Sequence, residues 1–277
     1  MKKYMKKIID IDSESKGAIK IMAIIAAFLW IATNTCAQAQ EKGVSFNVQG
    51  DLVSSYIWRG MYQSGAAIQP TLGLSAGGFS LTAWGSVDFT GQGHKEADLT
   101  AAYSVKGFTI SLADYWWAGQ AGSNTSGEKA NTDVDGAGRN KYFNFDNRDT
   151  KHILEAGLAY TLPVEKFPLS IAWYTMFWGG DKKVNDKGEV KNAYSSYIEL
   201  NYPFTVKTVD LNATLGASPF KSPGNYYNDG FAVTNVGLKA TKAIRFTDNF
   251  SLPVFAQAIW SPSREDVHFV FGITLKP

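Results

Sequence analysis

Residues 44–59 read VSFNVQGDLVSSYIWR, and apolar side chains recur at every second position. The apolar parity holds Val44, Phe46, Val48, Gly50, Leu52, Ser54, Tyr56 and Trp58. The polar parity holds Ser45, Asn47, Gln49, Asp51, Val53, Ser55, Ile57 and Arg59. Successive side chains on a β-strand point to opposite faces, so this stretch predicts a strand with one apolar and one hydrated face. It is longer than the usual globular strand of about 5–6 residues, and it is long enough to cross a bilayer when the strand is tilted.

Eleven further stretches are typical of strands, and their connections alternate between long and short. The predicted strands are 44–59, 67–76, 79–90, 96–106, 108–118, 151–162, 168–178, 194–206, 209–218, 231–241, 250–260 and 267–276. The odd-numbered connections are long, and most even-numbered ones are very short. Outer-membrane barrels have short periplasmic turns and longer extracellular loops. The pattern therefore predicts an all-β fold, a transmembrane antiparallel up-and-down β-barrel of about 12 strands, with both chain ends on the periplasmic side.

Two stretches fit this pattern less well than the others. Pro253 has no backbone N–H to give to a sheet, and residues 231–241 alternate only loosely. A barrel of ten to fourteen strands therefore stays open. A soluble periplasmic β-sandwich is the alternative fold, although it does not explain the unequal connections.

Aromatic side chains gather near the predicted strand ends, as in the girdles at the two membrane interfaces. The outer group is Tyr56, Trp58, Tyr115, Trp116, Trp117, Phe177, Trp178, Tyr194, Phe231 and Trp260. The periplasmic group is Phe46, Phe79, Phe108, Tyr160, Tyr202, Phe204 and Phe250. The alternative is that aromatic residues simply favour strands.

The N-terminus is typical of a secretory signal. Six lysines precede the apolar run 21–32, and Ala37-Gln38-Ala39 is a small-residue cleavage site. We expect a signal peptide at 1–39 and the barrel at 40–277, so the mature chain has no cysteine. An uncleaved anchor and lipidation of Cys36 are the alternatives; the apolar run is shorter than the roughly 20 residues of a spanning helix.

Composition excludes several classes of function. The net charge is only +2, and the mature region has no basic tract, so we expect no nucleic-acid partner. There is no metal-ligand cluster, phosphate-binding glycine loop or nucleotide motif, and we predict no cofactor. Aromatic residues make up 14% of the chain, while the mean hydropathy is −0.16. A barrel with a polar lumen has this combination.

Residues 54–86, SSYIWRGMYQSGAAIQPTLGLSAGGFSLTAWGS, resemble the start of the TorF family of bacterial porin-like barrels. The matching residues are Ser54, Tyr56, Trp58, Arg59, Gly60, Gln69, Pro70, Gly78, Phe79, Trp84, Gly85 and Ser86. The resemblance implies an outer-membrane location, passage of small solutes, and contact with membrane lipid and the barrel-assembly machinery. One departure concerns the last strand, VHFVFGITLKP, which ends in Lys276-Pro277 rather than in the aromatic residue that the assembly machinery reads.

The polar parity supplies candidate pore-lining residues. They are Asp51, Arg59, Asp88, Glu96, Asp98, Lys151, Glu155, Glu199, Asp210 and Lys239. Seven acidic against three basic residues predict a lumen that favours cations or neutral polar solutes, because rings of charge set pore selectivity. The alternative is that these charges pair across strands and plug the interior. Twelve strands suit a narrow channel rather than a wide porin.

Two alternatives concern what the barrel does, and a further pair concerns its longest connection. A closed barrel would serve as a structural or surface-binding protein. A rim lipid hydrolase would need a nucleophile beside His94, His152 or His268, yet none lies in a His-x-Ser pattern. The long connection 119–150 is either a solvated loop or a constriction, and its Asp133–Gly136 portion only faintly resembles a calcium loop. We predict a channel, not an enzyme, with oligomeric state open.

Overall fold

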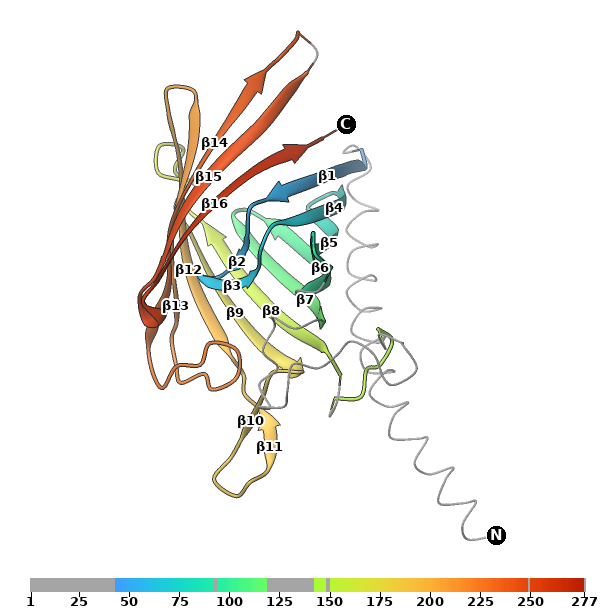
Figure 1. The fold of residues 1–277 in the computed structure, drawn as a ribbon, viewed down its shortest axis with the longest axis vertical. Coiled ribbons are helices and arrows are strands. Elements are labelled where there is room, and N and C mark those ends of the chain that lie inside the picture. The colour runs from blue at the N-terminus through green and yellow to red at the C-terminus, as the bar shows by residue number, and fades with distance from the viewer. Residues whose placement is uncertain (1–42, 92–93, 119–141, 148–149, 249, 277) are drawn as a thin grey trace, which may run out of the picture.

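The computed structural model describes residues 43–91, 94–118, 142–147, 150–248 and 250–276, and they form a closed antiparallel barrel (Figure 1). Twelve strands close the ring in the order β1-β16-β15-β14-β13-β12-β9-β8-β7-β6-β5-β4. Their bounds are β1 Ser45–Val53, β4 Ala67–Ala76, β5 Phe79–Asp88, β6 Lys95–Val105, β7 Phe108–Ala118, β8 His152–Thr161, β9 Ser170–Gly179, β12 Ser196–Val206, β13 Val209–Ser218, β14 Ala232–Arg245, β15 Ser251–Ser261 and β16 Asp266–Leu275. The predicted fold class and strand count are confirmed.

Most connections at the two ends of the barrel differ in length as predicted; the exceptions are the link 162–169 from β8 to β9 and the short link 262–265 from β15 to β16. At one end, β4–β5, β6–β7 and β12–β13 are joined by two-residue turns. β14 runs to Arg245, beyond the predicted end at residue 241, so its turn to β15 is also shorter than expected. Pro253 lies in β15 opposite Ala243, near this end of the strand. The connection 219–231 and the small hairpin β10 (Lys182–Val184)–β11 (Val190–Asn192) lie at the extracellular end (Figure 1).

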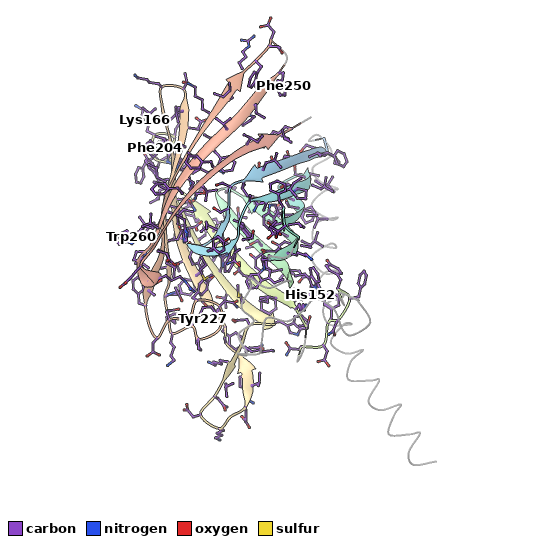
Figure 2. All side chains as sticks on the ribbon, in the orientation of Figure 1. His152, Lys166, Phe204, Tyr227, Phe250 and Trp260 are labelled. Carbon is purple, nitrogen blue, oxygen red and sulfur yellow. The ribbon has the colours of Figure 1, made fainter. Side chains whose placement is uncertain are left out.

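The outer surface of the ring is an apolar band. Phe46 (78% exposed), Leu72 (59%) and Phe269 (66%) belong to the outward parity of their strands. Phe204 and Phe250 lie toward the periplasmic end and Trp260 toward the other (Figure 2). Because an apolar exterior on a closed sheet suits lipid, this is a barrel of the bacterial outer membrane. Within the described residues there is no helix with the length and apolar character needed to span a bilayer.

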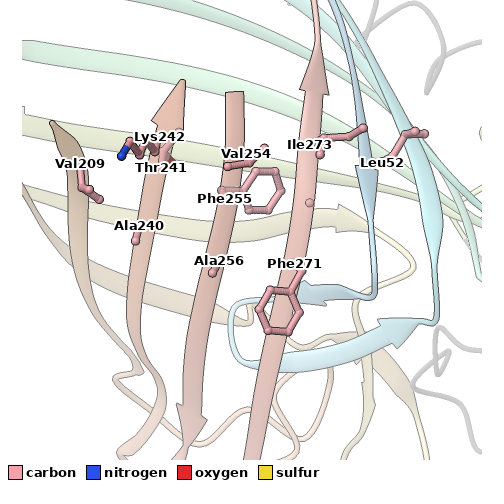
Figure 3. A pocket seen from close by; sticks show the side chains of 11 residues that line it. Leu52, Val209, Ala240, Thr241, Lys242, Val254, Phe255, Ala256, Phe271 and Ile273 are labelled. Carbon is pink, nitrogen blue, oxygen red and sulfur yellow. The ribbon is translucent and has the colours of Figure 1, made fainter. Parts of the chain in front are cut away.

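A shallow apolar groove of about 490 Å³ crosses this outer band (Figure 3). Small residues such as Ala240 and Ala256 line it beside the larger Phe271 and Ile273. Most of the groove faces the surroundings of the barrel rather than its lumen, because most of its lining residues lie on the outward parity of their strands; Thr241, Phe255 and Gly272 lie on the inward parity.

The first predicted strand is wrong in its second half. β1 ends at Val53, and residues 54–66 leave the wall as a short hairpin of β2 (Tyr56–Trp58) and β3 (Met61–Ser64). We call residues 54–66 the inserted hairpin. The Tyr56 ring lies 5.3 Å from the Trp84 ring and is buried rather than placed at the outer girdle.

The outer girdle is therefore smaller than predicted. Trp58, Tyr115 and Trp117 pack on one another inside the barrel. Their sequence positions near strand ends are those of girdle residues, but Tyr115 and Trp117 lie on the inward parity of β7, and Trp58 lies on the inserted hairpin. Trp260 (53% exposed) and Phe231 (68%) do lie at the outer surface.

The two end strands join over a short distance. β1 and β16 pair only from Gly50 to Val53, opposite Gly272 to Leu275. Ser54 continues the contact: its N–H donates to the Phe271 carbonyl, and its hydroxyl accepts from the Phe271 N–H. Beyond this point the chain turns into the lumen as the inserted hairpin. The predicted signal peptide, Cys36 and the Asp133–Gly136 segment lie outside the described residues, so those expectations stay predictions.

Candidate functional site

A buried ion pair lies where the inserted hairpin crosses the lumen. The Arg59 guanidinium donates from Nη1 to Glu155 Oε2 at 2.7 Å and from Nη2 to Oε1 at 2.8 Å. The two side chains are 11% and 2% exposed. β8, which carries Glu155, is five strands away from β1 around the ring. Arg59 therefore reaches across the interior, and the pair ties the hairpin to the far wall.

Aromatic rings surround this guanidinium. Its carbon lies 4.6, 4.7 and 4.5 Å from the ring centroids of Trp58, Tyr174 and Tyr197. Arg59 Nη1 also donates to the Tyr226 hydroxyl at 2.6 Å, and the Tyr115 hydroxyl donates to Glu155 Oε1 at 2.9 Å. A guanidinium over aromatic faces gains from the negative charge of each ring face, most of all where water is excluded. We call Glu155 with the five rings the arginine cage.

The backbone of the hairpin tip explains how Arg59 reaches the cage. Arg59 (φ 51°) and Gly60 (φ 83°) both take left-handed conformations, which let the chain reverse tightly. A Cβ on Gly60 would lie 1.8 Å from the Thr234 carbonyl oxygen, so only glycine lets the tip pack against β14. Met61 then packs with Tyr197 and Tyr226 in a buried cluster.

The barrel wall has local irregularities beside the cage. The register of β8 with β9 shifts between Leu154 and Glu155, and that of β13 with β14 shifts between Gly216 and Ala217. Bulges redirect side chains next to functional sites. A Cβ on Gly216 would lie 1.9 Å from the Tyr197 hydroxyl, so this glycine leaves the space that the ring occupies.

The extracellular connection 219–231 supplies the remaining cage residue, Tyr226. A buried polar network holds this segment: Asp181 accepts from the Ser195 hydroxyl at 2.7 Å and from Asn225 Nδ2 at 2.8 Å. The Ser222 hydroxyl donates to Ser195 Oγ at 2.7 Å. Burial raises the pKa of Asp181, against the opposing effect of its hydrogen bonds. Burial also raises the pKa of Tyr226, so its hydroxyl is protonated where Arg59 meets it.

A second cluster of charge lies on β6. Glu96 accepts from Trp117 Nε1 at 2.6 Å, and its other oxygen lies 2.8 Å from His94 Nε2. Asp98 lies two residues further on, opposite Trp84 of β5 and Tyr115 of β7, and so shares the inward face with Glu96. Two predicted lining carboxylates thus stand side by side near the arginine cage.

The other predicted residues are spread around the ring. Asp51 pairs in register with Gln69 and Thr274. Asp88 accepts from the Thr90 hydroxyl at 2.9 Å. Lys239 Nζ lies 4.0 Å from the Phe255 ring centre, and Lys151 is half-buried before β8. They do not join the cage.

Two further predicted carboxylates lie beyond the cage. Glu199 accepts from the Tyr197 hydroxyl at 2.8 Å, and so supports a cage ring from behind. Asp210 is exposed and accepts from the Thr205 hydroxyl at 2.9 Å. Of the ten candidates, the structure brings Arg59 and Glu155 into direct contact. Glu199 contacts Tyr197, whose ring in turn contacts Arg59.

Sequence reasoning missed Asp114. It occupies the outward parity of β7, where its carboxylate lies 2.9 Å from His152 Nδ1. His152 is fully buried under the Phe145 ring, whose centre is 4.2 Å away, and its Nε2 lies 2.5 Å from the Tyr142 carbonyl. The sequence did contain a signal for this contact: Asp114 is an acidic residue among the apolar residues of the outward parity, and a buried carboxylate needs a partner.

The three histidines show no pairing with a nucleophile. Within the described residues, the hydrogen bonds of the His94 and His152 rings go to carboxylates and a carbonyl oxygen, and His268 stacks on Tyr62. In the same part of the chain there is no group of three or more His, Cys, Asp or Glu residues placed to hold a metal ion.

Comparison with known proteins gives only distant similarity. No protein-family model matches the chain, and no curated protein matches it. The fold is similar to a NanC porin, with TM-score 0.42 and 9% identity, over 84% of this chain and 98% of that one. It is also similar to a KdgM porin in complex with disordered oligogalacturonate, with TM-score 0.41 and 12% identity, over 85% and 99%. Membership of the TorF family stays a prediction.

Proposed function

We propose that the barrel is an outer-membrane channel through which small polar or cationic solutes diffuse passively. The observation that carries this proposal is the inward face of the ring, where carboxylates of β6, β8 and β12 stand on a polar wall enclosed by an apolar exterior. A closed sheet with such an interior suits hydrated solutes. The proposal involves no catalysis and no cofactor.

The inserted hairpin sets the bore. It crosses from β1 to β8 and is held at both ends, so solutes pass beside it or after it moves. Arg59 neutralises Glu155, whereas Glu96 lies 2.8 Å from His94 Nε2 and has a second carboxylate, Asp98, beside it on the inward face of β6. The acidic surplus near β6 therefore supports a preference for cations, as expected from the sequence.

A second function is favoured by one observation. The extracellular half of the lumen is packed with buried rings and an ion pair, and this matches the sequence alternative in which charges pair and plug the interior. A barrel closed in this way would act as a scaffold or surface-binding protein through its extracellular segments.

Conductance in planar bilayers separates the two functions. Purified protein is reconstituted, and single-channel steps and the reversal potential are measured across a KCl gradient. Stepwise openings with a cation-selective reversal potential support the channel, and the Glu96→Gln/Asp98→Asn double variant should reduce that selectivity. If neither the wild type nor a variant whose hairpin tip cannot seat, such as Gly60→Val, conducts any current, the scaffold function is supported. A clear anion preference contradicts the assignment of an acidic lumen.

A further inference from the structure

The arginine cage and the arginine inside it come from three parts of the molecule. Glu155, Tyr115, Tyr174 and Tyr197 come from strands β8, β7, β9 and β12 of the barrel wall. Trp58 and Arg59 come from the inserted hairpin, and Tyr226 comes from the connection 219–231. The wall alone therefore presents a carboxylate with a tyrosine hydroxyl donating to it, and two rings that contact the same guanidinium. We call these four wall residues the wall cage.

The geometry of the wall cage fits one kind of cation. Both carboxylate oxygens receive separate N–H donors, at 2.7 and 2.8 Å. The rings of Tyr174 and Tyr197 lie 4.7 and 4.5 Å from the guanidinium carbon. A planar fork of N–H groups satisfies both contacts at once, whereas an ammonium is a compact point charge that cannot match the two oxygens in this way.

Charge is not needed merely to hold a hairpin in a lumen. Apolar side chains of similar volume often hold buried segments as well as, or better than, an ion pair, because both charges must first lose their water. Arg59 is a ligand placed on a segment that leaves the wall at Ser54, next to the short β1–β16 join. The arrangement is that of a site occupied by its own tethered ligand.

We propose that the wall cage is a binding subsite for the guanidinium group of an incoming solute, and that Arg59 is the resident competitor for it. This inference rests on the proposed channel function, since it names the class of solute that the lumen receives. A solute guanidinium takes the place of the Arg59 guanidinium on Glu155, and the hairpin tip then leaves the cage. No covalent step is involved.

Equilibrium binding of methylguanidinium to detergent-solubilised protein tests the proposal. Tryptophan and tyrosine fluorescence is titrated for wild type, Arg59→Ala and Arg59→Ala/Glu155→Gln, at constant ionic strength. Removing the competitor should tighten binding at least about tenfold relative to wild type, because a site that is free only one time in ten weakens apparent affinity by that factor. The added Glu155→Gln change should abolish this gain.

Two controls define what the signal means. Arg245→Ala removes an arginine whose partner, Asp248, is exposed, and should give no new site. Methylammonium should bind Arg59→Ala more weakly than methylguanidinium, since it lacks the planar fork. If Arg59→Ala fails to give a folded, heat-modifiable barrel, Arg59→Gln, which is nearer in size, is used in the same titration.

The outcomes are clear-cut. Equal affinity in wild type and Arg59→Ala, binding that survives Glu155→Gln, or equal binding of methylammonium would each overturn the proposal. The binding test measures fluorescence and does not require the barrel to conduct. A barrel that never conducts would therefore contradict the proposed channel function, while the binding test would still decide whether the wall cage binds guanidinium. In a conducting Arg59→Ala barrel, methylguanidinium should also reduce single-channel current, and the Glu155→Gln double variant should be insensitive.

Discussion

The extracellular and periplasmic halves of the lumen are built differently. In the extracellular half, side chains are almost fully buried: Tyr197 is 0% and Glu155 2% exposed, and their contacts join elements far apart in the chain. In the periplasmic half, the inward side chains are partly exposed and bond to near neighbours. There Thr214 donates to Asn201 Oδ1 at 2.7 Å and Asn212 Nδ2 to the same oxygen at 3.0 Å, all between β12 and β13.

This difference separates two tasks within one ring. In the periplasmic half, polar side chains line strands that pair in regular register. In the extracellular half, register shifts, residues in the left-handed backbone conformation and an ion pair hold the inserted segments. Changes in the extracellular half should therefore alter both stability and passage, and changes in the periplasmic half should alter neither strongly.

The largest effect is expected from Gly60→Val. The new Cβ would meet the Thr234 carbonyl, and valine is strained at φ 83°, so the tip cannot seat. The docking of the hairpin should lose on the order of 4 kcal/mol or more. Single-channel conductance should rise several-fold. Gly188→Ala is the matched control, because this glycine also has positive φ but open space around it. Unchanged conductance in Gly60→Val would show that the hairpin is not the constriction.

Glu155→Gln should have the next largest effect. It leaves the Arg59 charge buried without its carboxylate, and removing one member of a buried pair typically costs about 3–5 kcal/mol. The temperature at which the folded band disappears on denaturing gels should fall. Glu199→Gln is the control, since that carboxylate accepts from the Tyr197 hydroxyl but forms no ion pair with a cation within the described residues. Equal shifts in both variants would mean that the ion pair has no special role.

Ser195→Ala should have a moderate effect confined to the extracellular segment. It removes the hydroxyl that links Asp181 to Ser222, and an unsatisfied buried polar group costs about 1–3 kcal/mol. Hydrogen exchange of residues 219–231 should speed up, while the β12–β13 ladder stays protected. Lys221→Ala is a control: it breaks an exposed pair with Asp229 and should leave exchange unchanged. Faster exchange throughout the barrel would contradict a local role.

The smallest effect is expected from Asp210→Asn in the periplasmic half. Its carboxylate is exposed and accepts a hydrogen bond from the Thr205 hydroxyl, a near neighbour in the chain, so the thermal transition should not move. Cation selectivity should fall slightly at low salt and not at all at high salt, since exposed charges are screened within about 10 Å at 0.1 M. A change in selectivity larger than that of Glu96→Gln/Asp98→Asn would reverse the ranking of the two halves.

Much of the ring follows from its sequence, because period-two alternation and turn length are local properties. The strand count and the unequal ends could both be predicted from them. The departure at Ser54 could not. Residues 54–59 keep the alternation of the strand before them, and the alternation alone does not tell a wall strand from a hairpin that packs inside it.

Of the cage and its arginine, the sequence indicated only Arg59 and Glu155 as lumen residues, and it did not indicate Tyr174, Tyr197 or Tyr226. Arg59 and Glu155 are 96 residues apart, and nothing local indicates that they meet. Their contact depends on the ring closing and on the bulge before Glu155. Asp114 was missed for a similar reason, because its partner His152 reaches it only through the pairing of β7 with β8.

The short β1–β16 join has a consequence for how the barrel forms. A ring made from one chain closes only when its first and last strands meet, and here four residue pairs and Ser54 make that closure. Since those pairs include Gly272 to Leu275, the wall becomes continuous only once β16 has been made and has met β1, which precedes it by more than 200 residues in the chain.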